Sequence, residues 1–574
     1  MKTYWKYIKP YLSAFIFGPL CMIVEVIGEV IMPKLLAVVI NNANAGTLTN
    51  GISLRTMVLM ILTALLMMAG GIGGAFFATK ASVNFAADLR ADAYSRIQKF
   101  SFANIDKFST GSLVTRLTND ITQLQNFIGM LLRMALRAPG MMIAALVMAI
   151  IISPRLSVVF VVSIPVLLVV VGSIILTGFP RFKIVQKKVD ALNSNVQENV
   201  TNARLVKSFV REDFETEKFK VSNRELKDAG MSATKIMIFM SPVMTIIMNA
   251  TVVAVILIGG PIALDGGMAV GDLSAFLTYV TQILSSLVMI SFLLMFSSRA
   301  LASSKRIHEV LDEVPDINDD NAAYKDKVIT EGEIEFKNVT FRYYKNSDDP
   351  VLENINLKIP AGATVGIIGS TGSGKTTLVS LIPRLYDPDE GSVLIDGVDV
   401  KDYSLWNLRE GVGMVLQKNV LFSGSIADNL RWGDMDASDE EIKKYSEYAQ
   451  ADKFVSSFKE GYDTMLDQGG TNVSGGQKQR LCIARALLKK PKILILDDST
   501  SAVDTATEAQ IRKAFKEEIS GSTKIIIAQR VSSVMEADMI VVVNDGKIAN
   551  VGTHEELLES SVEYREIYDS QMGK

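Results

Sequence analysis

Six long apolar runs in the first half of the chain constrain its fold more than any other feature of the sequence. They lie at about residues 11–40, 54–79, 127–152, 156–178, 236–262 and 272–297. A helix crosses a bilayer with about 20 apolar residues, so each run predicts a membrane span. We therefore predict a membrane α-helical domain with six long transmembrane helices (1–300), a polar linker (301–327) and a soluble α/β domain (328–574).

Lysine and arginine residues gather in two of the segments that connect these runs. The basic segments are 80–126 and 179–235, whereas 41–53, 153–155 and 263–271 carry at most one basic residue each. Basic loops stay on the cytoplasmic side of a membrane. The N-terminus, both basic connectors and the soluble domain are therefore predicted to lie in the cytoplasm, on one side of the cytoplasmic membrane.

The two basic connectors keep a helical pattern rather than the composition of loops. Residues 80–100 and 181–235 contain few glycines or prolines, so the membrane helices are predicted to continue past the bilayer as hairpins. The hairpins would turn near 103–112 and 209–217 and press against the soluble domain. Lysines and aromatic residues alternate in segment 1–10, which predicts an interfacial helix in contact with membrane lipid.

The composition argues against several classes of function. The net charge is −3 and the soluble part has no basic stripe, so no nucleic-acid partner is expected. The two cysteines, Cys21 and Cys482, give neither a disulfide framework nor a metal-binding spacing. The first apolar run is long and lacks a small-residue cleavage site, so no cleavable signal peptide is expected.

A phosphate-binding motif, G-x-x-x-x-G-K-[ST], lies in the soluble part between an apolar strand-like segment and a helix-like segment. Its residues are Gly369, Ser370, Thr371, Gly372, Ser373, Gly374, Lys375, Thr376 and Thr377. Glycines let backbone N–H groups surround phosphate oxygens, and the helix N-terminus adds positive potential. Lys375 is predicted to reach the β- and γ-phosphates of a nucleotide, and the Thr376 hydroxyl to bind Mg²⁺. The alternative is a Gly/Ser loop with an incidental lysine.

Further polar residues lie at the ends of apolar segments in the same domain. Asp497 ends one such strand and is predicted to hold Mg²⁺, while Asp498 stands where a base would orient the attacking water. Gln417 ends another strand and is a candidate ligand for Mg²⁺ or a water. Tyr343 precedes the phosphate loop and is predicted to stack on adenine, unless it only packs in the core. Gln529 and Asp504 complete the set.

A second anion-binding turn opens a helix at Ser474, Gly475, Gly476 and Gln477. Two such turns in one domain are redundant unless they serve different nucleotides. The second turn is therefore predicted to face the γ-phosphate held by another copy of the domain.

These motifs, in this order and spacing, resemble those of the ATP-binding cassette (ABC) transporters. With the six preceding spans, the whole chain resembles a bacterial half-transporter of the exporter type. The resemblance implies that two such chains pair and exchange helical hairpins. It also implies that two ATP molecules, with Mg²⁺, lie between one chain's phosphate loop and the other's signature turn, here VSGGQ.

The chain departs from the family pattern at two positions. Asp498 stands where the family has a glutamate, and Gln529 where it has a switch histidine; the chain's 2 histidines, His308 and His554, lie elsewhere. Asp498 is one methylene too short, and Gln529 cannot exchange a proton as imidazole does. We therefore predict that this chain's own ATP site hydrolyses poorly, and that its signature turn serves a partner half-transporter with an intact glutamate and histidine. This is the pattern of the degenerate-site subunit of a heterodimeric multidrug exporter.

Two acidic residues of the first span indicate the charge of the transported substrate. Glu25 and Glu29 share one helix face, and we predict that they line a water-filled cavity that favours cationic amphiphilic substrates. The alternative is a purely structural role. Counting along the helices puts Glu25 about 21 Å and Arg137 about 8 Å above the inner face, so direct pairing is not expected. Arg133 and Arg137 likewise share a face of the third span.

Methionines and phenylalanines of the second, fifth and sixth spans suit an adaptable apolar pocket or plain helix packing. They are Met67, Met68, Phe76, Met240, Met244, Phe292 and Phe296. Three other functions stay open on the sequence alone: a lipid or peptide exporter subunit, a slow homodimeric exporter, and an ATP-gated membrane protein without transport.

Overall fold

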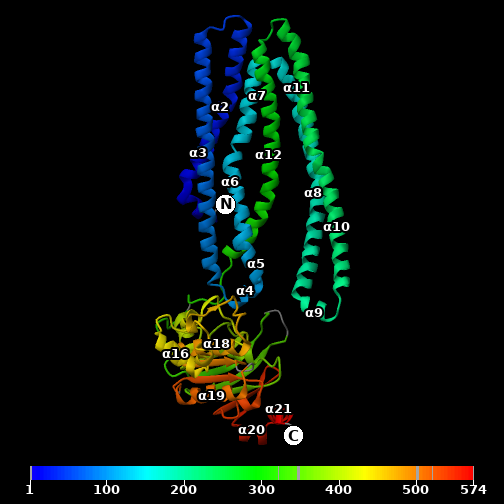
Figure 1. Cartoon of the computed structure of the whole chain (residues 1–574). Helices are drawn as coiled ribbons and strands as arrows, with labels where there is room; N and C mark the ends of the chain where they lie inside the picture. The colour runs from blue at the N-terminus through cyan, green and yellow to red at the C-terminus, as the bar shows by residue number, and fades with distance from the viewer. Residues whose placement is uncertain (1–2, 321, 345–348, 500–502, 520, 573–574) are drawn as a thin grey trace. The chain divides into compact units, whose positions relative to one another are not determined.

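The computed structural model describes residues 3–320, 322–344, 349–499, 503–519 and 521–572 (Figure 1). The chain divides into two compact units. The first consists of Met1–Gln98 and Gly111–Asp312, and the second of Lys99–Thr110 and Glu313–Lys574. The first unit is helical, and the second combines sheets and helices.

Helices make up the first unit, several of them long (Figure 1). They are α1 (Trp5–Ile8), α2 (Leu12–Asn44), α3 (Asn50–Ile97), α5 (Thr110–Thr115), a π-helical turn (Arg116–Asp120), α6 (Ile121–Met134), α7 (Arg137–Ile152), α8 (Pro154–Thr201), α9 (Ala203–Ser208), α10 (Glu212–Ile238), α11 (Met240–Leu264) and α12 (Val270–Leu311). Within the described residues, five helical stretches are long and apolar enough to cross a membrane. The other predicted span is α2, whose 33 residues include the charged Glu25, Glu29 and Lys34.

Glycines let α2 and α3 approach closely. A Cβ on Gly70 would lie 2.9 Å from the carbonyl oxygen of Cys21, and one on Gly74 would lie 2.1 Å from the Met22 side chain. Polar contacts then fasten α12 to α2. The buried Tyr279 hydroxyl donates to the carbonyl of Val30 at 2.7 Å, and Lys34 pairs with Asp272 at 2.7 Å. These two polar contacts fix the position of α12 along α2, which apolar packing alone does not specify.

The structure differs from the sequence prediction at two helix boundaries. Helix α12 continues to Leu311, so the first part of the predicted linker 301–327 is helical. Buried Ser303, Ile307 and Val310 recur at helical spacing there, and the polar residues form the other face. The second hairpin turns at 202–211 rather than 209–217, because Glu212 and its acidic neighbours open α10, where negative charge favours a helix N-terminus.

The second unit is built on a six-stranded sheet with the order β12-β11-β3-β10-β9-β6. Its strands are β3 (Thr364–Ile368), β6 (Val412–Val415), β9 (Ile493–Asp497), β10 (Thr523–Ile527), β11 (Met539–Asn544) and β12 (Lys547–Gly552), parallel except for β12. The five residues of β9 are all buried, with alternate side chains in the cores on the two faces. Burial on both faces is typical of parallel strands.

A four-stranded antiparallel sheet, β2-β1-β4-β5, covers one of these cores. It consists of β1 (Ile334–Phe341), β2 (Leu352–Ile359), β4 (Glu390–Ile395) and β5 (Val398–Asp399). Helices α13 (Lys375–Ser380) and α14 (Leu405–Glu410) pack in this same core. The core on the other face is formed with α15 (Ile426–Arg431), α16 (Asp439–Tyr448), α17 (Asp452–Val455), α18 (Gly475–Leu488), α19 (Thr505–Glu517), α20 (His554–Ser560) and α21 (Val562–Met572). A short strand pair, β7 (Gly424–Ser425) and β8 (Met465–Leu466), completes the unit.

The turn of the first hairpin belongs to this second unit. It is the short helix α4 (Phe102–Phe108), which overlaps the predicted turn region 103–112. The Asn104 amide donates to Glu313 at 2.9 Å, and Ser101 donates to Asp316 at 2.8 Å. Tyr386 also contacts this helix, through the ring of Phe102, which is tilted at 45° to its own. Helix α4 is therefore held to the start of the sheet domain by polar side chains.

Candidate functional site

The phosphate loop connects β3 to α13, as the motif predicts. Gly374 has a φ of +97°, which suits glycine, and a Cβ on Gly369 would lie 2.0 Å from the carbonyl oxygen of Val543. Ser370, Thr371, Gly372 and Ser373 form the turn between them. The Lys375 ammonium donates to the carbonyls of Gly369 (2.9 Å) and Ser370 (2.7 Å). The loop thus closes around its own lysine.

Thr376 and Asp497 meet at a place suited to a hard cation. The Thr376 hydroxyl donates to Asp497 Oδ1 at 3.0 Å, and Asp497 is 1 % exposed. Asp497 Oδ2 is buried with no hydrogen-bond partner in the described part of the chain. Burial raises the pKa of Asp497 more than the hydrogen bond from Thr376 lowers it, and the charge of Asp498 adds to the rise. Hydroxyl and carboxylate oxygens are the ligands Mg²⁺ prefers, so these residues fit that ion.

Parallel strands bring three more predicted residues together. Gln417 follows β6, Asp498 follows β9 and Gln529 follows β10, and these strands are neighbours in the sheet. The Gln529 amide donates to Asp498 Oδ2 at 2.7 Å, and Gln417 also hydrogen-bonds the Asp498 side chain. Burial raises the pKa of Asp498 despite these bonds. Gln417 therefore contacts Asp498, whereas its position at a strand end predicts a ligand for Mg²⁺ or a water.

Lys375 lies in the same electrostatic environment as the two aspartates. Burial lowers the pKa of the Lys375 ammonium, and the charges of Asp497 and Asp498 oppose that change. A lysine ammonium in a glycine-rich loop between a strand and a helix is suited to a polyphosphate. When Mg²⁺ is bound there with a nucleotide, it neutralises charge on the phosphates.

Tyr343 lies just beyond β1 and packs against the start of α13. Its hydroxyl is 3.0 Å from the Thr377 hydroxyl, and its ring meets Phe341 and Tyr386 edge-on. The side chain is 44 % exposed. The ring is thus anchored at its edge and tip, an arrangement that leaves part of its surface for a base.

The signature turn is formed and exposed. Ser474 caps the 14-residue helix α18: its hydroxyl accepts from the Gln477 N–H, and the Gln477 side chain accepts from the Ser474 N–H. Gly475 and Gly476 form the first turn of that helix. Among the described residues, no hydrogen bond or ion pair connects Ser474 or Gln477 to the phosphate loop. Ser474 and Gly475 are exposed to solvent.

Asp504 has a local structural role in this structure. It caps α19 by accepting from the Thr507 N–H at 3.0 Å and from its hydroxyl at 2.7 Å. The backbone hydrogen bond from Thr507 lowers the pKa of Asp504.

Sequence reasoning missed Gln571, on the last helix α21. Its side chain donates to the carbonyl of Gln529 at 2.7 Å and accepts from the N–H of Val531 at 2.8 Å. These two bonds hold the backbone on both sides of Arg530, beside the Asp498 contact. No local motif marks such a residue, because the contact joins positions 42 residues apart.

In the helical unit, the predicted separation of Glu25 from Arg137 is wrong. Arg137 Nη2 lies 3.1 Å from Glu25 Oε1 and 2.7 Å from Glu29 Oε1. The two depths had been counted from opposite faces of a fixed bilayer, whereas α2 is longer than the bilayer is thick. Counted from the outer ends, Asn44 of α2 and Ile152 of α7, Glu29 and Arg137 each lie 15 residues inward (44 − 29 and 152 − 137).

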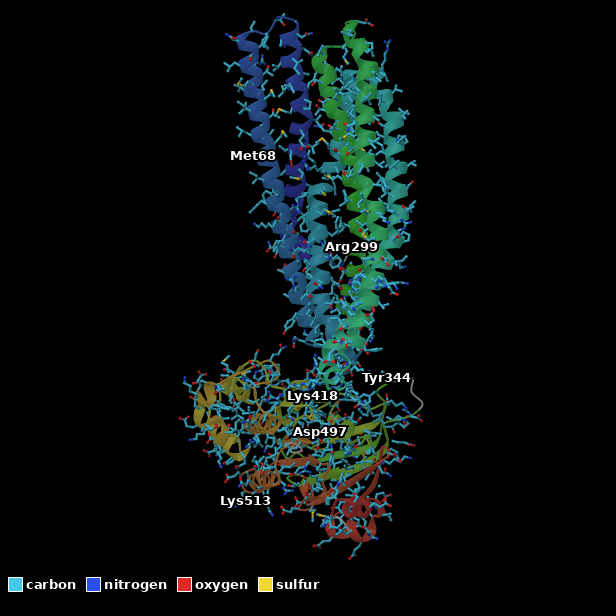
Figure 2. All side chains as sticks on the ribbon, turned by 45° about the vertical axis from the view of Figure 1, so that its right-hand side comes forward. Met68, Arg299, Tyr344, Lys418, Asp497 and Lys513 are labelled. Atoms are coloured by element: carbon cyan, nitrogen blue, oxygen red, sulfur yellow. The ribbon has the colours of Figure 1, made fainter. Side chains whose placement is uncertain are left out.

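The other predicted residues of the helical unit are not all in one place. Arg133 bonds the carbonyl of Gly129 on its own helix. Met67 lines a cavity together with Glu29 and Arg137, whereas Met68, labelled in Figure 2, is 56 % exposed on α3. Met240 and Met244 pack against the apolar core between the helices. Phe76, Phe292 and Phe296 are exposed and do not line the cavity.

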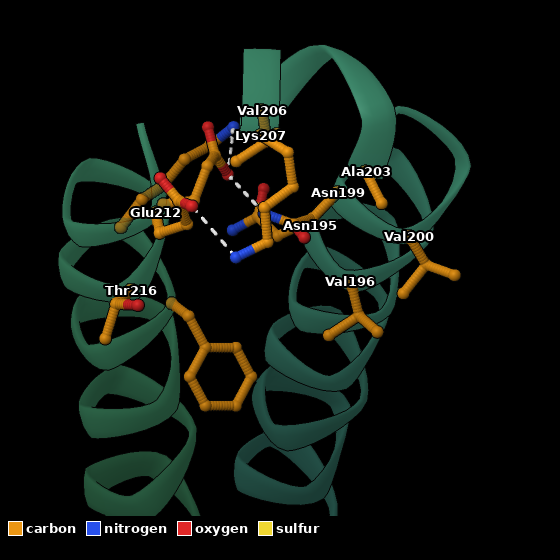
Figure 3. Close-up of a pocket in the computed structure, with 12 residues that line it drawn as sticks. Asn195, Val196, Asn199, Val200, Ala203, Val206, Lys207, Glu212 and Thr216 are labelled. Carbon is orange, nitrogen blue, oxygen red and sulfur yellow. Dashed lines mark hydrogen bonds and ion pairs between the residues drawn. The ribbon is translucent and has the colours of Figure 1, made fainter. Parts of the chain in front are cut away.

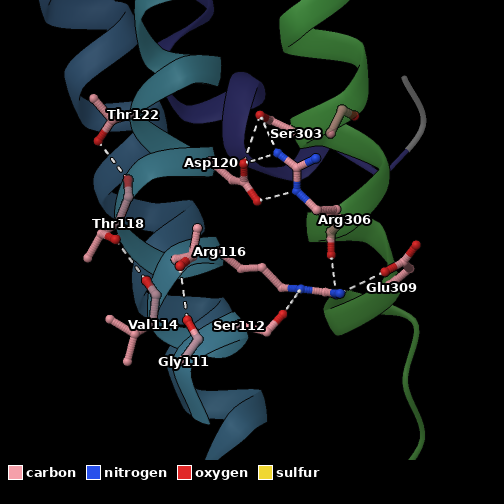
Figure 4. A network of polar contacts seen from close by, with 12 residues as sticks. Gly111, Ser112, Val114, Arg116, Thr118, Asp120, Thr122, Ser303, Arg306 and Glu309 are labelled. Atoms are coloured by element: carbon pink, nitrogen blue, oxygen red, sulfur yellow. Dashed lines mark hydrogen bonds and ion pairs between the residues drawn. The ribbon is translucent and has the colours of Figure 1, made fainter. Parts of the chain in front are cut away.

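A second polar network, also missed from the sequence, ties the π-helical turn to α12 (Figure 4). Buried Asp120 accepts from Ser303 at 2.8 Å and from Arg306 Nε at 2.8 Å. Arg116 lies 2.9 Å from Glu309 and donates to the carbonyl of Arg306. A π-turn within a helix is often found at functional positions, and here it directs Asp120 at α12.

The second hairpin, α8–α9–α10, ends in an open groove of about 370 Å³, drawn in Figure 3. Val196 and Val200 line it from α8, and Phe219 from α10. Phe209 and Val210 at the turn are 66 % and 79 % exposed. Contact between this hairpin and a nucleotide-binding domain remains a prediction.

Replacing Asp497 by asparagine should remove the Mg²⁺-dependent part of the stabilisation that ATP gives to the folded protein. A ligand at 100 times its Kd stabilises the folded protein by about 2.7 kcal/mol, and the variant should lose the share of that stabilisation that requires Mg²⁺. The raised pKa means that the folded, Mg²⁺-free protein holds this proton more tightly than the unfolded chain does. Falling pH therefore favours that folded state and opposes Mg²⁺, and the effect should begin at a higher pH than for an ordinary carboxylate.

Melting curves with ATP, with and without Mg²⁺, from pH 5 to 8 measure both effects. Asp498→Asn is the matched control, because the neighbouring carboxylate is held by two amides. An unchanged Mg²⁺ response in Asp497→Asn would contradict the assignment.

Comparison with known proteins gives concordant results along the whole chain. A family model for the ABC transporter transmembrane region matches residues 15–287, and one for the ABC transporter matches residues 352–501. An uncharacterized ABC transporter ATP-binding protein of Bacillus subtilis, YfiB, is 38 % identical over 574 residues, covering 100 % of this chain and 99 % of its own.

More distant relatives extend the comparison. An ATP-dependent lipid A-core flippase of Syntrophus aciditrophicus is 34 % identical over 84 % of this chain and 80 % of its own. The solved structure of a bacterial Atm1-family ABC exporter with ATP bound superposes with a TM-score of 0.81 at 25 % identity, covering 98 % of this chain and 99 % of that one.

Proposed function

This chain belongs to the ABC transporter family, and on that premise we propose that it is the degenerate-site subunit of a heterodimeric exporter of amphiphilic small molecules. Its fold is an N-terminal transmembrane helical domain followed by an ABC ATPase domain, which is the architecture of an ATP-driven exporter half. Half-transporters of this family generally dimerise. The proposal concerns which of the two ATP sites this chain weakens, and what cargo it moves.

The contact between Gln529 and Asp498 is the observation that carries the proposal. A base that orients water must be able to accept its proton and reach it. Here the Asp498 carboxylate receives hydrogen bonds from two carboxamides, and its side chain is one methylene shorter than glutamate. Neither carboxamide exchanges protons. ATP with Mg²⁺ would then bind at Lys375, Thr376 and Asp497 but be split slowly.

The exposed, fully capped turn at Ser474 supports the second half of the proposal. In a pair of such chains, this turn would complete the partner's ATP site, where an intact glutamate and histidine hydrolyse ATP. Hydrolysis there would reset the transmembrane helices after ATP has closed the two ATPase domains. We also propose that the protein lies in the cytoplasmic membrane, with its ATPase domain and N-terminus in the cytoplasm.

Lipid translocation is a second candidate for the cargo. It is favoured by the similarity to the lipid A-core flippase of Syntrophus aciditrophicus, which spans most of both chains. In this alternative the two ATP sites still hydrolyse ATP at unequal rates, and only the transported amphiphile differs.

The purified chain, alone in lipid nanodiscs, should bind ATP and hydrolyse it slowly. A membrane preparation from its native host should yield a one-to-one complex with a second half-transporter, and the ATPase rate of that complex should be about 100-fold higher or more, since a positioned base contributes about 10²–10⁴ in rate. Brisk ATP hydrolysis by the chain alone, abolished by Asp498→Asn, would instead identify a homodimeric exporter and overturn the proposal.

A further inference from the structure

We propose that a cavity between α2, α3, α7 and α12 binds a monocationic amphiphile whose head group contacts Glu29, Arg137 and Gln282. The cavity has a volume of about 500 Å³ and lies entirely within the helical unit. A volume of this size holds a drug-sized molecule. The inference rests on the proposed function in one respect: it names the chemical class of the cargo.

The walls of the cavity suit an apolar body of variable shape. Five methionines line it: Met32, Met60, Met67, Met141 and Met289. Methionine is unbranched and polarisable, so its side chain adapts to different apolar surfaces. Polar groups are concentrated on α12, where Thr278, Thr281 and Gln282 contribute. An amphiphile can therefore place its body among thioethers and its head against a polar wall.

The charges beside the cavity do not balance. One guanidinium nitrogen of Arg137 is shared between Glu25 (3.1 Å) and Glu29 (2.7 Å), and the three side chains are only 27 %, 19 % and 21 % exposed. Two carboxylates and one guanidinium leave a net charge of −1 in a mostly apolar setting. Charges that are poorly solvated need a partner. A single positive charge balances the group, whereas an anion increases the imbalance.

Two residues of the lining each carry a buried polar atom without a partner, and these atoms suggest the rest of the head group. Arg137 Nε and Gln282 Oε1 are buried without a hydrogen bond in the described residues. The orientation of the Gln282 amide is fixed chemically, because its Nε2 donates to the carbonyl of Glu29 at 3.0 Å and a carbonyl only accepts. Both atoms have almost no accessible surface, so a ligand with an N–H donor for Gln282 and an oxygen acceptor for Arg137 reaches them once these side chains turn toward the cavity.

Equilibrium dialysis of two dyes against the full chain in phosphatidylcholine nanodiscs tests this inference. Rhodamine 6G is a monocation with N–H donors and an ester oxygen, and fluorescein ethyl ester is an anion on the same ring skeleton. We expect saturable, one-to-one retention of rhodamine 6G above empty nanodiscs, and no such retention of the anion. Glu29→Gln should weaken rhodamine 6G binding at least tenfold, because it removes the excess negative charge.

Two further variants separate the cavity from general effects on the protein. Ser285 lies on the lining and is exposed, so Ser285→Trp fills the cavity without disturbing the core, and should also weaken binding at least tenfold. Asp272→Asn removes another carboxylate of the helical unit, paired with Lys34 away from the cavity lining, and should leave binding unchanged. An ATP-induced rise in melting temperature shows that each variant is folded.

The outcomes distinguish this inference from the proposed function. Absence of rhodamine 6G binding, equal binding of the anion, or affinity unchanged in both Glu29→Gln and Ser285→Trp overturns the cavity assignment and identifies a purely structural ion cluster. These results leave the unequal ATP sites untouched. Conversely, brisk ATP hydrolysis by the chain alone overturns the proposed function while selective rhodamine 6G binding still supports the cavity.

Discussion

Replacing Asp498 by glutamate and Gln529 by histidine together should raise ATP hydrolysis at this chain's own site by about 10²–10⁴-fold, the contribution of a positioned general base. The glutamate adds the missing methylene, and the histidine replaces an amide that donates to Asp498 Oδ2 at 2.7 Å. The Asp498 N–H donates to the carbonyl of Ile527, and the Asp498 backbone is in the left-handed region, with a φ of +48°. The new carboxylate therefore starts from a preorganised position.

Hydrolysis at the two ATP sites of the assembly must be measured separately. The partner's phosphate-loop lysine is replaced by alanine, so that turnover reports on the site formed by Lys375 and Asp497 of this chain. Each single variant should recover less than the pair, because a glutamate without the histidine still faces a carboxamide. An unchanged rate in the double variant would show that hydrolysis is limited elsewhere, and a wild-type rate already equal to the partner's would contradict the degenerate site.

The parts of the site that the sequence predicts are those fixed by local geometry. A phosphate loop is a short segment between a strand and a helix, so its glycines and Lys375 are recognisable without a fold. The meeting of Gln417, Asp498 and Gln529 follows from one further step, since the ends of parallel strands share one edge of a sheet. What the strand pattern does not give is the pairing itself, in which both amides bind Asp498.

The parts that could not be predicted depend on contacts between distant segments. The ion cluster of Glu29 and Arg137 depends on α2 being longer than a bilayer is thick, and a count that fits α2 into the bilayer misplaces its residues relative to Arg137 by many ångströms. Gln571 reaches Gln529 across 42 positions from a helix without a motif. The end of α12 could not be predicted for another reason. An amphipathic helix and a polar linker have similar compositions, and only the burial of Ile307 and its neighbours distinguishes them.

Replacing Ser474 by alanine should lower ATP hydrolysis by the assembly about 100-fold or more, although Ser474 lies outside this chain's own phosphate loop. Removing one donor that stabilises charge in a transition state costs about 10²–10³ in rate. By contrast, Lys375→Ala, which damages the loop of this chain, should lower the rate less than tenfold, since that site contributes little turnover. A homodimer predicts large losses from both changes.

The loss must be separated from damage to the helix that Ser474 caps, because removing such a cap costs about 1 kcal/mol of stability. Ser438 is a matched control: it is exposed, and it caps α16 through the same reciprocal bonds, with Glu441 in place of Gln477. Ser438→Ala should lower the melting temperature as much as Ser474→Ala does, with little change in ATPase rate. Equal rates in the two serine variants would mean that the turn at Ser474 only starts a helix, and the unequal contribution of the two chains to hydrolysis would no longer hold.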